Sequence, residues 1–226
     1  MTADNKSRKR STDEVDGLTS SSRVKSLIRN DILAGNLHPG ERMKIADIAM
    51  RYGTSQMPVR EALYQLEGEG LLEISAHRGA VIRNVDSKFI YDMYEIRRVL
   101  EAMLLSHAMS NFRADHLKRL ENASEDYKRA AASNNASEML RCNSAFHTII
   151  NQAGDNPEAI RILNRGWDLI FALRLRFGFG PTRVAQIIEE HDSLVAAMRE
   201  ADLEKAVKIS DQHCRAARDD LLAQLA

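Results

Sequence analysis

Apolar residues in the N-terminal third of the chain recur at helical spacing in three short runs. A loop with Pro39 and Gly40 separates the first two runs, because neither residue continues a helix there. Gly53 ends the second run, since glycine tolerates the left-handed backbone of a tight turn. Thr54 or Ser55 then offers an N-cap oxygen to the third helix. This order and spacing predict a helix-turn-helix.

Two short apolar strands follow the third helix, at 71–74 and 80–83, and form the wing of a winged helix-turn-helix. In this fold the start of the third helix enters the major groove of DNA. There Arg60 can bind a guanine edge through two hydrogen bonds, and Gln56 can pair with adenine or a phosphate. Arg78, at the wing tip, can lie against the DNA backbone or in a minor groove. The predicted DNA-binding residues are Ser55, Gln56, Met57, Arg60, His77, Arg78 and Gly79.

Beyond Asp86 the sequence carries almost no strand signal, and residues that interrupt helices divide it into helical stretches. We expect six helices, at about 87–110, 114–132, 137–153, 157–177, 182–200 and 203–224. Six helices joined by short loops predict an antiparallel bundle, whose interior can hold metals and small ligands. The predicted fold is mainly α: a flexible tail at 1–20, a winged helix-turn-helix domain at 21–85, and an all-helical effector-binding and dimerisation domain at 86–226.

Composition supports two domains, because 226 residues with 44% hydrophobic side chains can bury a substantial core. The formal net charge is zero, which does not favour nonspecific binding to polyanions or to a membrane surface. The two cysteines, Cys142 and Cys214, favour a reducing compartment over a disulfide framework. The sequence has neither an apolar run of membrane-spanning length nor a signal-peptide core. We therefore predict a cytoplasmic protein without a membrane partner.

Three histidines of the C-terminal half fall on apolar faces of different predicted helices. His147 follows Asn143 by four residues, so the two side chains project from one helix face toward one point. Neutral imidazoles suit zinc, nickel, copper and iron. The alternative is that each histidine is a hydrogen-bonded core residue, but several buried imidazoles without partners would be costly. We predict a divalent metal, zinc or nickel first, held by Asn143, His147, His191 and His213.

Arg97 is the predicted effector-binding residue. It shares a helical face with Met93 and Leu100, so we expect its guanidinium to reach into the bundle. A buried guanidinium needs a partner, and a carboxylate effector supplies one through two hydrogen bonds. An ion pair with Glu101, one turn along the helix, is the structural alternative.

The N-terminal runs resemble the GntR family of bacterial transcription regulators. The resemblance is carried, without gaps, by Leu37–Arg42, Pro58–Leu63, Leu66–Leu71 and Arg78–Ala80. The family usually has an arginine where this chain has Gln56, so the resemblance implies the same DNA-binding role with a different base preference.

The C-terminal half is similar to the FCD effector domain of the FadR-like branch of these regulators, on Asn143–His147, Glu190-His191 and His213. In many members an aspartate or asparagine and three histidines at these positions hold a divalent metal. The family pattern Arg-x-x-Leu-Glu, present at Arg97–Glu101, implies an effector-facing role. Asn143 replaces the commoner aspartate, and its neutral amide oxygen is a weaker ligand for a cation. Six helices without a seventh resemble the VanR-type subgroup.

Together the residues and the resemblance predict a DNA-binding transcription regulator, a repressor and not an enzyme. We expect a homodimer on a near-palindromic operator in double-stranded DNA. A small organic-acid effector, bound by the metal and Arg97, would shift the two winged helices to an arrangement that no longer fits DNA. One alternative is a helical metalloenzyme fused to a DNA-binding module, although no clear general base is present. A second alternative is a constitutive DNA-binding protein whose bundle serves only dimerisation. A third is that the N-terminal unit is a protein-interaction module.

Overall fold

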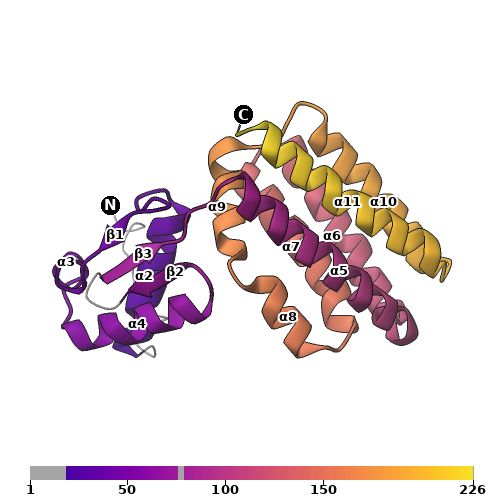
Figure 1. The fold of residues 1–226 in the computed structure, drawn as a ribbon. Helices are drawn as coiled ribbons and strands as arrows, with labels where there is room; N and C mark the ends of the chain where they lie inside the picture. Colours follow the sequence, from indigo (N-terminus) through magenta and orange to yellow (C-terminus); the bar gives the residue numbers. More distant parts are fainter. Residues whose placement is uncertain (1–18, 76–78, 226) are drawn as a thin grey trace, which may run out of the picture. The chain divides into compact units, whose positions relative to one another are not determined.

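The computed structural model describes residues 19–75 and 79–225, and these divide into two compact units (Figure 1). The first unit ends at Asn84 and the second begins at Val85. Between them the units contain ten described helices and one small sheet, so the chain is mainly α as the sequence predicts. Among the described residues, no helix has the length and the apolar character needed to cross a lipid bilayer.

The first unit is a winged helix-turn-helix, as predicted. Its helices are α2 (Ser20–Leu33), α3 (Ile45–Arg51) and α4 (Gln56–Gly68). Its strands are β1 (Arg42–Met43), β2 (Leu72–Ser75) and β3 (Gly79–Ile82), which form an antiparallel sheet in the order β1-β3-β2. The inward face of α4 is apolar, and four of its residues are at most 2% exposed: Val59, Ala62, Leu63 and Leu66. Gly53 has a φ of 61°, which explains the glycine at the turn between α3 and α4.

Two details of this unit differ from the sequence prediction. The sheet has a third strand, β1, which pairs with β3 through Arg42 opposite Val81 and Met43 opposite Ala80. A two-residue strand is too short to show a period in the sequence. Ser55 is the N-cap of α4, yet its side chain makes no capping hydrogen bond, so the expected cap oxygen is not used. Its hydroxyl is therefore not committed to the end of the helix.

The described residues of the second unit form seven helices, so the prediction of six was wrong. They are α5 (Ser87–Asn111), α6 (Ala114–Ala132), α7 (Ala136–Ala153), α8 (Pro157–Asn164), α9 (Trp167–Phe177), α10 (Arg183–Arg199) and α11 (Leu203–Ala223). The predicted helix 157–177 is broken at Gly166, whose φ of 74° is incompatible with a continuous right-handed helix. The resemblance to the VanR-type subgroup was based on six helices, and the described residues do not support that count.

Side-chain caps mark the start of four helices of this unit. Asp86 accepts a hydrogen bond from the backbone N–H of Phe89 at the start of α5, and Asn135, Asn156 and Asp202 cap α7, α8 and α11 in the same way. Within the unit, α5 packs against α11, α6 packs against α7, and α10 contacts both α6 and α11 (Figure 1). Helices α7, α10 and α11 thereby come together around one interior region.

Candidate functional site

The start of α4 presents its predicted DNA-binding residues to solvent. Ser55, Gln56, Met57 and Arg60 are all exposed, as a surface that reads DNA requires. Tyr64 follows Arg60 by one turn and is 61% exposed, which extends this stripe beyond the residues that the sequence singled out. Its only sequence signal was its spacing from Arg60.

The predicted wing-tip residues can be placed only in part. Gly79 begins β3 with a φ of 79°, and a Cβ at this position would lie 2.6 Å from the backbone oxygen of Met43. Only glycine fits such a site without a shift of the backbone. His77 and Arg78 lie outside the described residues.

Three of the predicted metal ligands meet inside the second unit. His147 on α7, His191 on α10 and His213 on α11 are buried, and each offers a donor atom within 4.8 Å of the other two. The Nε2 atoms of His147 and His213 are 3.1 Å apart. Asn143 lies one turn before His147, and its Oδ1 is buried without a hydrogen-bond partner among the described residues. The structure thus brings together the three histidines that the sequence selected, and Asn143 lies one turn from His147 on α7.

His191 provides the test of whether a metal fits here. It is 1% exposed, and neither of its ring nitrogens has a hydrogen-bond partner in the described part of the chain. Its ring stacks on Phe146, with centroids 3.9 Å apart and planes 6° from parallel. A buried imidazole with no partner is costly, so the interpretation as a satisfied core histidine fails at this residue. Three imidazoles and an amide oxygen fit a divalent transition metal such as zinc or nickel.

The protonation state of the cluster also suits a metal. Burial lowers the pKa of His147 to about 3, against the opposing effect of Glu101. Burial likewise lowers the pKa of His191 well below its usual value, and His213 and His147 act in the same direction. Both rings are therefore neutral at pH 7, which is the form that binds a metal ion.

Two of the histidines each lie close to an arginine–glutamate pair, and the first pair, Arg183 and Glu190, contacts His213. Oε2 of Glu190 is 2.6 Å from Nδ1 of His213, and Arg183 binds the other oxygen of Glu190 at 2.9 Å. Burial alone would raise the pKa of Glu190, but its hydrogen bonds from His213 and Arg183 lower it to about 2. No sequence pattern singled out Arg183, because its partners lie on another helix and two turns along its own. Spacing also associated Glu190 with His191 instead of His213.

The second pair is Arg97 and Glu101. They form an ion pair of 2.6 Å, and Glu101 Oε1 lies 3.7 Å from Nδ1 of His147. Burial would raise the pKa of Glu101, yet the charge of Arg97, followed by that of His147, lowers it to about 2. The Arg97 guanidinium also stacks over the ring of Trp167 at 4.0 Å. The ion pair considered as an alternative for Arg97 is thus present, beside the buried histidines.

Comparison with protein families explains this pairing of units. Residues 20–82 match the family described as bacterial regulatory proteins, gntR family, and residues 92–216 match the FCD domain. The chain belongs to the GntR family, in the branch with an FCD domain. The regulator HTH-type transcriptional repressor GlaR of Escherichia coli K12 is 28% identical over 196 residues, which cover 82% of this chain and 88% of GlaR.

Other GntR regulators align over similar lengths. The HTH-type transcriptional regulator YdhC of Bacillus subtilis is 27% identical over 180 residues, covering 79% of this chain and 80% of YdhC. The solved structure of E. coli McbR/YncC has a TM-score of 0.77 at 21% identity, covering 92% of this chain and all (100%) of that one, and it shows the shared fold. The matched domains and relatives are transcription regulators and not enzymes, so the metalloenzyme alternative finds no support.

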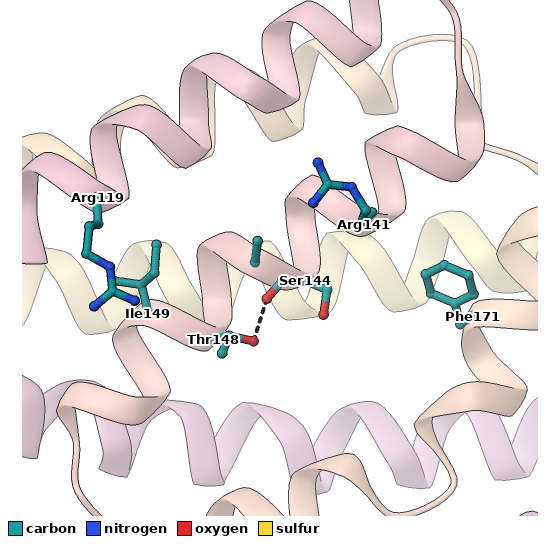
Figure 2. Close-up of a pocket in the computed structure, with 7 residues that line it drawn as sticks. Arg119, Arg141, Ser144, Thr148, Ile149 and Phe171 are labelled. Atoms are coloured by element: carbon teal, nitrogen blue, oxygen red, sulfur yellow. Dashed lines mark hydrogen bonds between the residues drawn. The ribbon is translucent and has the colours of Figure 1, made fainter. Parts of the chain in front are cut away.

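Apart from the histidine cluster, the FCD domain carries a pocket along α7. This pocket has a volume of about 490 Å³ and is lined by Arg119, Arg141, Ser144, Ala145, Thr148, Ile149 and Phe171. In Figure 2 the side chain of Arg119 reaches from α6 toward Ile149 on α7, and the hydroxyl of Thr148 donates to the backbone oxygen of Ser144 at 2.7 Å. None of the predicted metal ligands lines it, and neither does Arg97. The buried histidine cluster is therefore the site with the chemistry to hold a metal.

Proposed function

We propose that this GntR regulator is a homodimeric repressor whose affinity for a near-palindromic operator is set by a small carboxylate effector at a metal-containing pocket in the FCD domain. The observation that carries the proposal is His191, whose two ring nitrogens are buried without partners, among the described residues, beside His147 and His213. A core that served dimerisation alone would place an apolar residue there.

On the DNA side, α4 supplies the contacts to base edges. Gln56, Arg60 and Tyr64 follow one another at intervals of four residues along its exposed face. Arg60 forms no ion pair among the described residues, so its guanidinium is available to bind a guanine through two hydrogen bonds. Two copies of α4 in a homodimer would read two half-sites, which is why we expect a near-palindromic operator.

On the sensor side, the charge of the site favours an anionic effector. The three histidines and Asn143 are neutral ligands, and the negative charges of Glu101 and Glu190 are each balanced by an arginine. A bound divalent metal would act as a Lewis acid, and its neutral ligands would not compensate its positive charge. Arg97 pairs with Glu101, which in turn lies next to His147, and the side chain of Arg97 is 12% exposed. A carboxylate effector would compete with Glu101 for this guanidinium.

The route to the DNA-binding unit begins at Arg97. Arg97 and Glu101 lie on α5, the first helix after the winged unit, and α5 starts at Ser87. Neighbouring ion pairs hold α5 to α11: Arg98 binds Asp211 at 2.8 Å, and Arg218 binds Glu95 at 2.8 Å. An effector that loosened the Arg97–Glu101 pair would change how α5 packs, and the segment 84–87 would pass that change on. The effector must bind the DNA-incompatible arrangement more tightly to cause induction.

The first experiment measures the metal content of full-length protein purified without chelator or affinity histidines. We expect near-stoichiometric metal in the wild type, its loss in His147→Ala and in His213→Ala, and its retention in His107→Ala, because His107 is exposed on α5. Wild-type protein that is empty and also refuses added zinc or nickel would refute the metal-containing pocket.

The second experiment measures operator affinity in the presence of a panel of small carboxylates such as lactate, malate and citrate. We expect at least one acid to weaken operator binding by the wild type and to lose most of that effect in Arg97→Ala. Arg161→Ala is the control, since Arg161 lies on the exposed surface of α8. If every acid that binds the metal-loaded protein leaves operator affinity unchanged, the sensor role is wrong.

A further inference from the structure

We propose that Glu190, held by Arg183, is a positioning residue that fixes the tautomer of His213, so that Nε2 of this imidazole is the atom presented to the metal. The inference rests on the proposed metal pocket for its purpose. Its evidence, however, is a set of contacts between side chains of this chain, and it can be tested in the metal-free protein.

The two groups next to Nδ1 of His213 favour opposite tautomers. The carboxylate of Glu190 only accepts hydrogen bonds, so it favours a proton on Nδ1, whereas the guanidinium of Arg183 only donates and would favour an unprotonated Nδ1. Distance decides between them. Glu190 Oε2 lies 2.6 Å from Nδ1, and Arg183 lies 3.4 Å from it. The proton therefore belongs on Nδ1, and Nε2 keeps its lone pair.

Arg183 is bound elsewhere and serves to hold Glu190 in place. One of its terminal nitrogens donates to Glu190 Oε1 at 2.9 Å, and the other donates to the backbone oxygen of His213 at 3.2 Å. Its side chain is only 2% exposed. A buried guanidinium with these two acceptors has little freedom, so the carboxylate that it binds is fixed against the imidazole.

The direction of Nε2 agrees with this tautomer. Nε2 of His213 lies 3.1 Å from Nε2 of His147, and a hydrogen bond there requires that one nitrogen carries a proton and the other accepts it with a lone pair. With His213 protonated on Nδ1, the proton in that contact belongs to His147. Both Nε2 atoms lie in the region among the three rings, where donor atoms of all three histidines converge within 4.8 Å.

The three histidines differ in how firmly the protein orients them. Glu101 is 3.7 Å from Nδ1 of His147, which is beyond hydrogen-bond distance, and its Oε2 accepts from the thiol of Cys214 at 3.2 Å. His191 has no hydrogen-bond partner among the described residues. His213 is thus the ring whose orientation is set before any metal arrives. Outer partners of this kind change metal affinity by about 10- to 100-fold when they are removed.

The test replaces Glu190 by glutamine. In Glu190→Gln we expect Arg183 to bind the amide oxygen, which turns the amide NH2 toward Nδ1 of His213 and favours the Nε2–H tautomer. Zinc affinity should fall by about 10- to 100-fold. Glu189→Gln is the matched control, because Glu189 is the exposed neighbour on the same helix. Glu190→Asp keeps the carboxylate and should recover part of the affinity.

Two measurements are made on each full-length protein. Titration with zinc gives the affinity, and nitrogen NMR of histidine-labelled, metal-free protein gives the tautomer of His213. A wild-type His213 with its proton on Nδ1, shifted toward Nε2 in Glu190→Gln but not in Glu189→Gln, supports the proposal. A wild-type His213 protonated on Nε2, or equal zinc affinity in wild type and Glu190→Gln, overturns it.

The two proposals fail in different ways. If wild-type protein binds no metal, the metal-containing pocket is wrong, while the tautomer of His213 still decides the role of Glu190. If Glu190→Gln does not fold, the tautomer of His213 in the wild type alone supports or overturns the proposal. A loss of zinc affinity with no change of tautomer would assign Glu190 a merely structural role and would also overturn the proposal.

Discussion

The two units of this regulator both have apolar cores, but they differ in the polar residues that they bury. In the described part of the winged unit, Ser21 is the polar residue among otherwise apolar buried side chains. The FCD domain buries the charged or titratable residues Glu101, His147, Arg174, Arg183, His191, His213 and Arg218. The proposed DNA contacts lie on the exposed surface of α4, whereas the proposed metal site lies in the core of the FCD domain.

This contrast shows where function and stability are coupled. A surface residue such as Arg60 can change without disturbing the packing beneath it, since the inward face of α4 is apolar and includes the buried residues Val59 and Leu63. A buried polar group has no such independence, because removing one partner leaves the other unpaired in a medium of low dielectric constant. Mutations of the buried polar residues of the FCD domain should therefore alter stability as well as ligand binding.

Removing one partner of a buried ion pair should give the largest loss of stability in the FCD domain. Arg174 and Asp220 form such a pair, with side chains 4% and 13% exposed, and Asp220 also accepts from the backbone N–H of Gly180. We expect Asp220→Ala to lower the free energy of unfolding by about 3–5 kcal/mol. Glu158→Ala, which breaks the exposed Arg161–Glu158 pair, should change it by less than about 0.5 kcal/mol. Urea denaturation measures both, and equal effects would refute the contrast.

Replacing His191 should separate stability from binding. His191→Leu removes two buried nitrogens that lack partners among the described residues, so the metal-free protein should become more stable by about 1 kcal/mol. Zinc affinity should fall by more than about 100-fold. Loss of a residue that only orients a ligand lowers metal affinity by about 10- to 100-fold, and loss of a ligand itself should lower it further. Thermal unfolding and zinc titration give the two quantities. A leucine variant that binds zinc as well as the wild type would exclude His191 as a ligand.

On the surface of α4, the expected loss appears in DNA binding and not in folding. Arg60→Ala should weaken operator binding by about 1–3 kcal/mol, because one guanidinium can make two hydrogen bonds to a guanine. Binding to random DNA at the same salt concentration should weaken much less, and the unfolding midpoint should stay unchanged. An equal loss on operator and random DNA would show that Arg60 contacts phosphates instead of bases.

Acid should affect the FCD domain through its neutral histidines. The pKa of His147 is about 3 in the folded protein, below its ordinary value of 6.5. The unfolded chain therefore binds a proton that the folded one does not, and stability falls as the pH drops below 6.5. The slope is about 1.4 kcal/mol per pH unit for each such histidine.

Urea denaturation of the metal-free protein at pH 7, 6 and 5 measures this slope. The slope should be smaller in His147→Ala, which lacks the group. Glu101 adds a similar loss at lower pH, because its pKa falls from 4.5 to about 2 on folding. Constant stability between pH 7 and pH 5 would contradict a neutral, buried His147.

Sequence patterns were sufficient to find the metal-site candidates but not their partners. The stripe that contains His191 and the four-residue spacing of Asn143 and His147 place these side chains on interior helix faces, and the structure brings their helices together. The pairing of Glu190 with His213 joins two different helices. Period and spacing fix the face of a helix, whereas the partner of a side chain depends on how the helices pack.

Two features of the backbone show the same limit. Gly166 interrupts a stretch whose apolar period continues from α8 into α9, and a glycine within a helical pattern does not by itself indicate a break. Strand β1 exists because Arg42 and Met43 lie beside β3, a contact between segments far apart in the sequence. Both features follow from tertiary packing and have no local signal that outweighs the helical or loop pattern.

The length of helix α5 determines how far a movement at Glu101 would displace the start of the helix. It runs without interruption for 25 residues, and Glu101 lies fourteen residues after its first residue, Ser87. At a rise of 1.5 Å per residue, these two positions are about 21 Å apart. A tilt of about 5° around Glu101 would therefore displace the first turn by about 2 Å, more than half of the ~3.4 Å rise between neighbouring bases in DNA. A stiff lever of this length can turn a small rearrangement at one carboxylate into a misalignment on the scale of a base step.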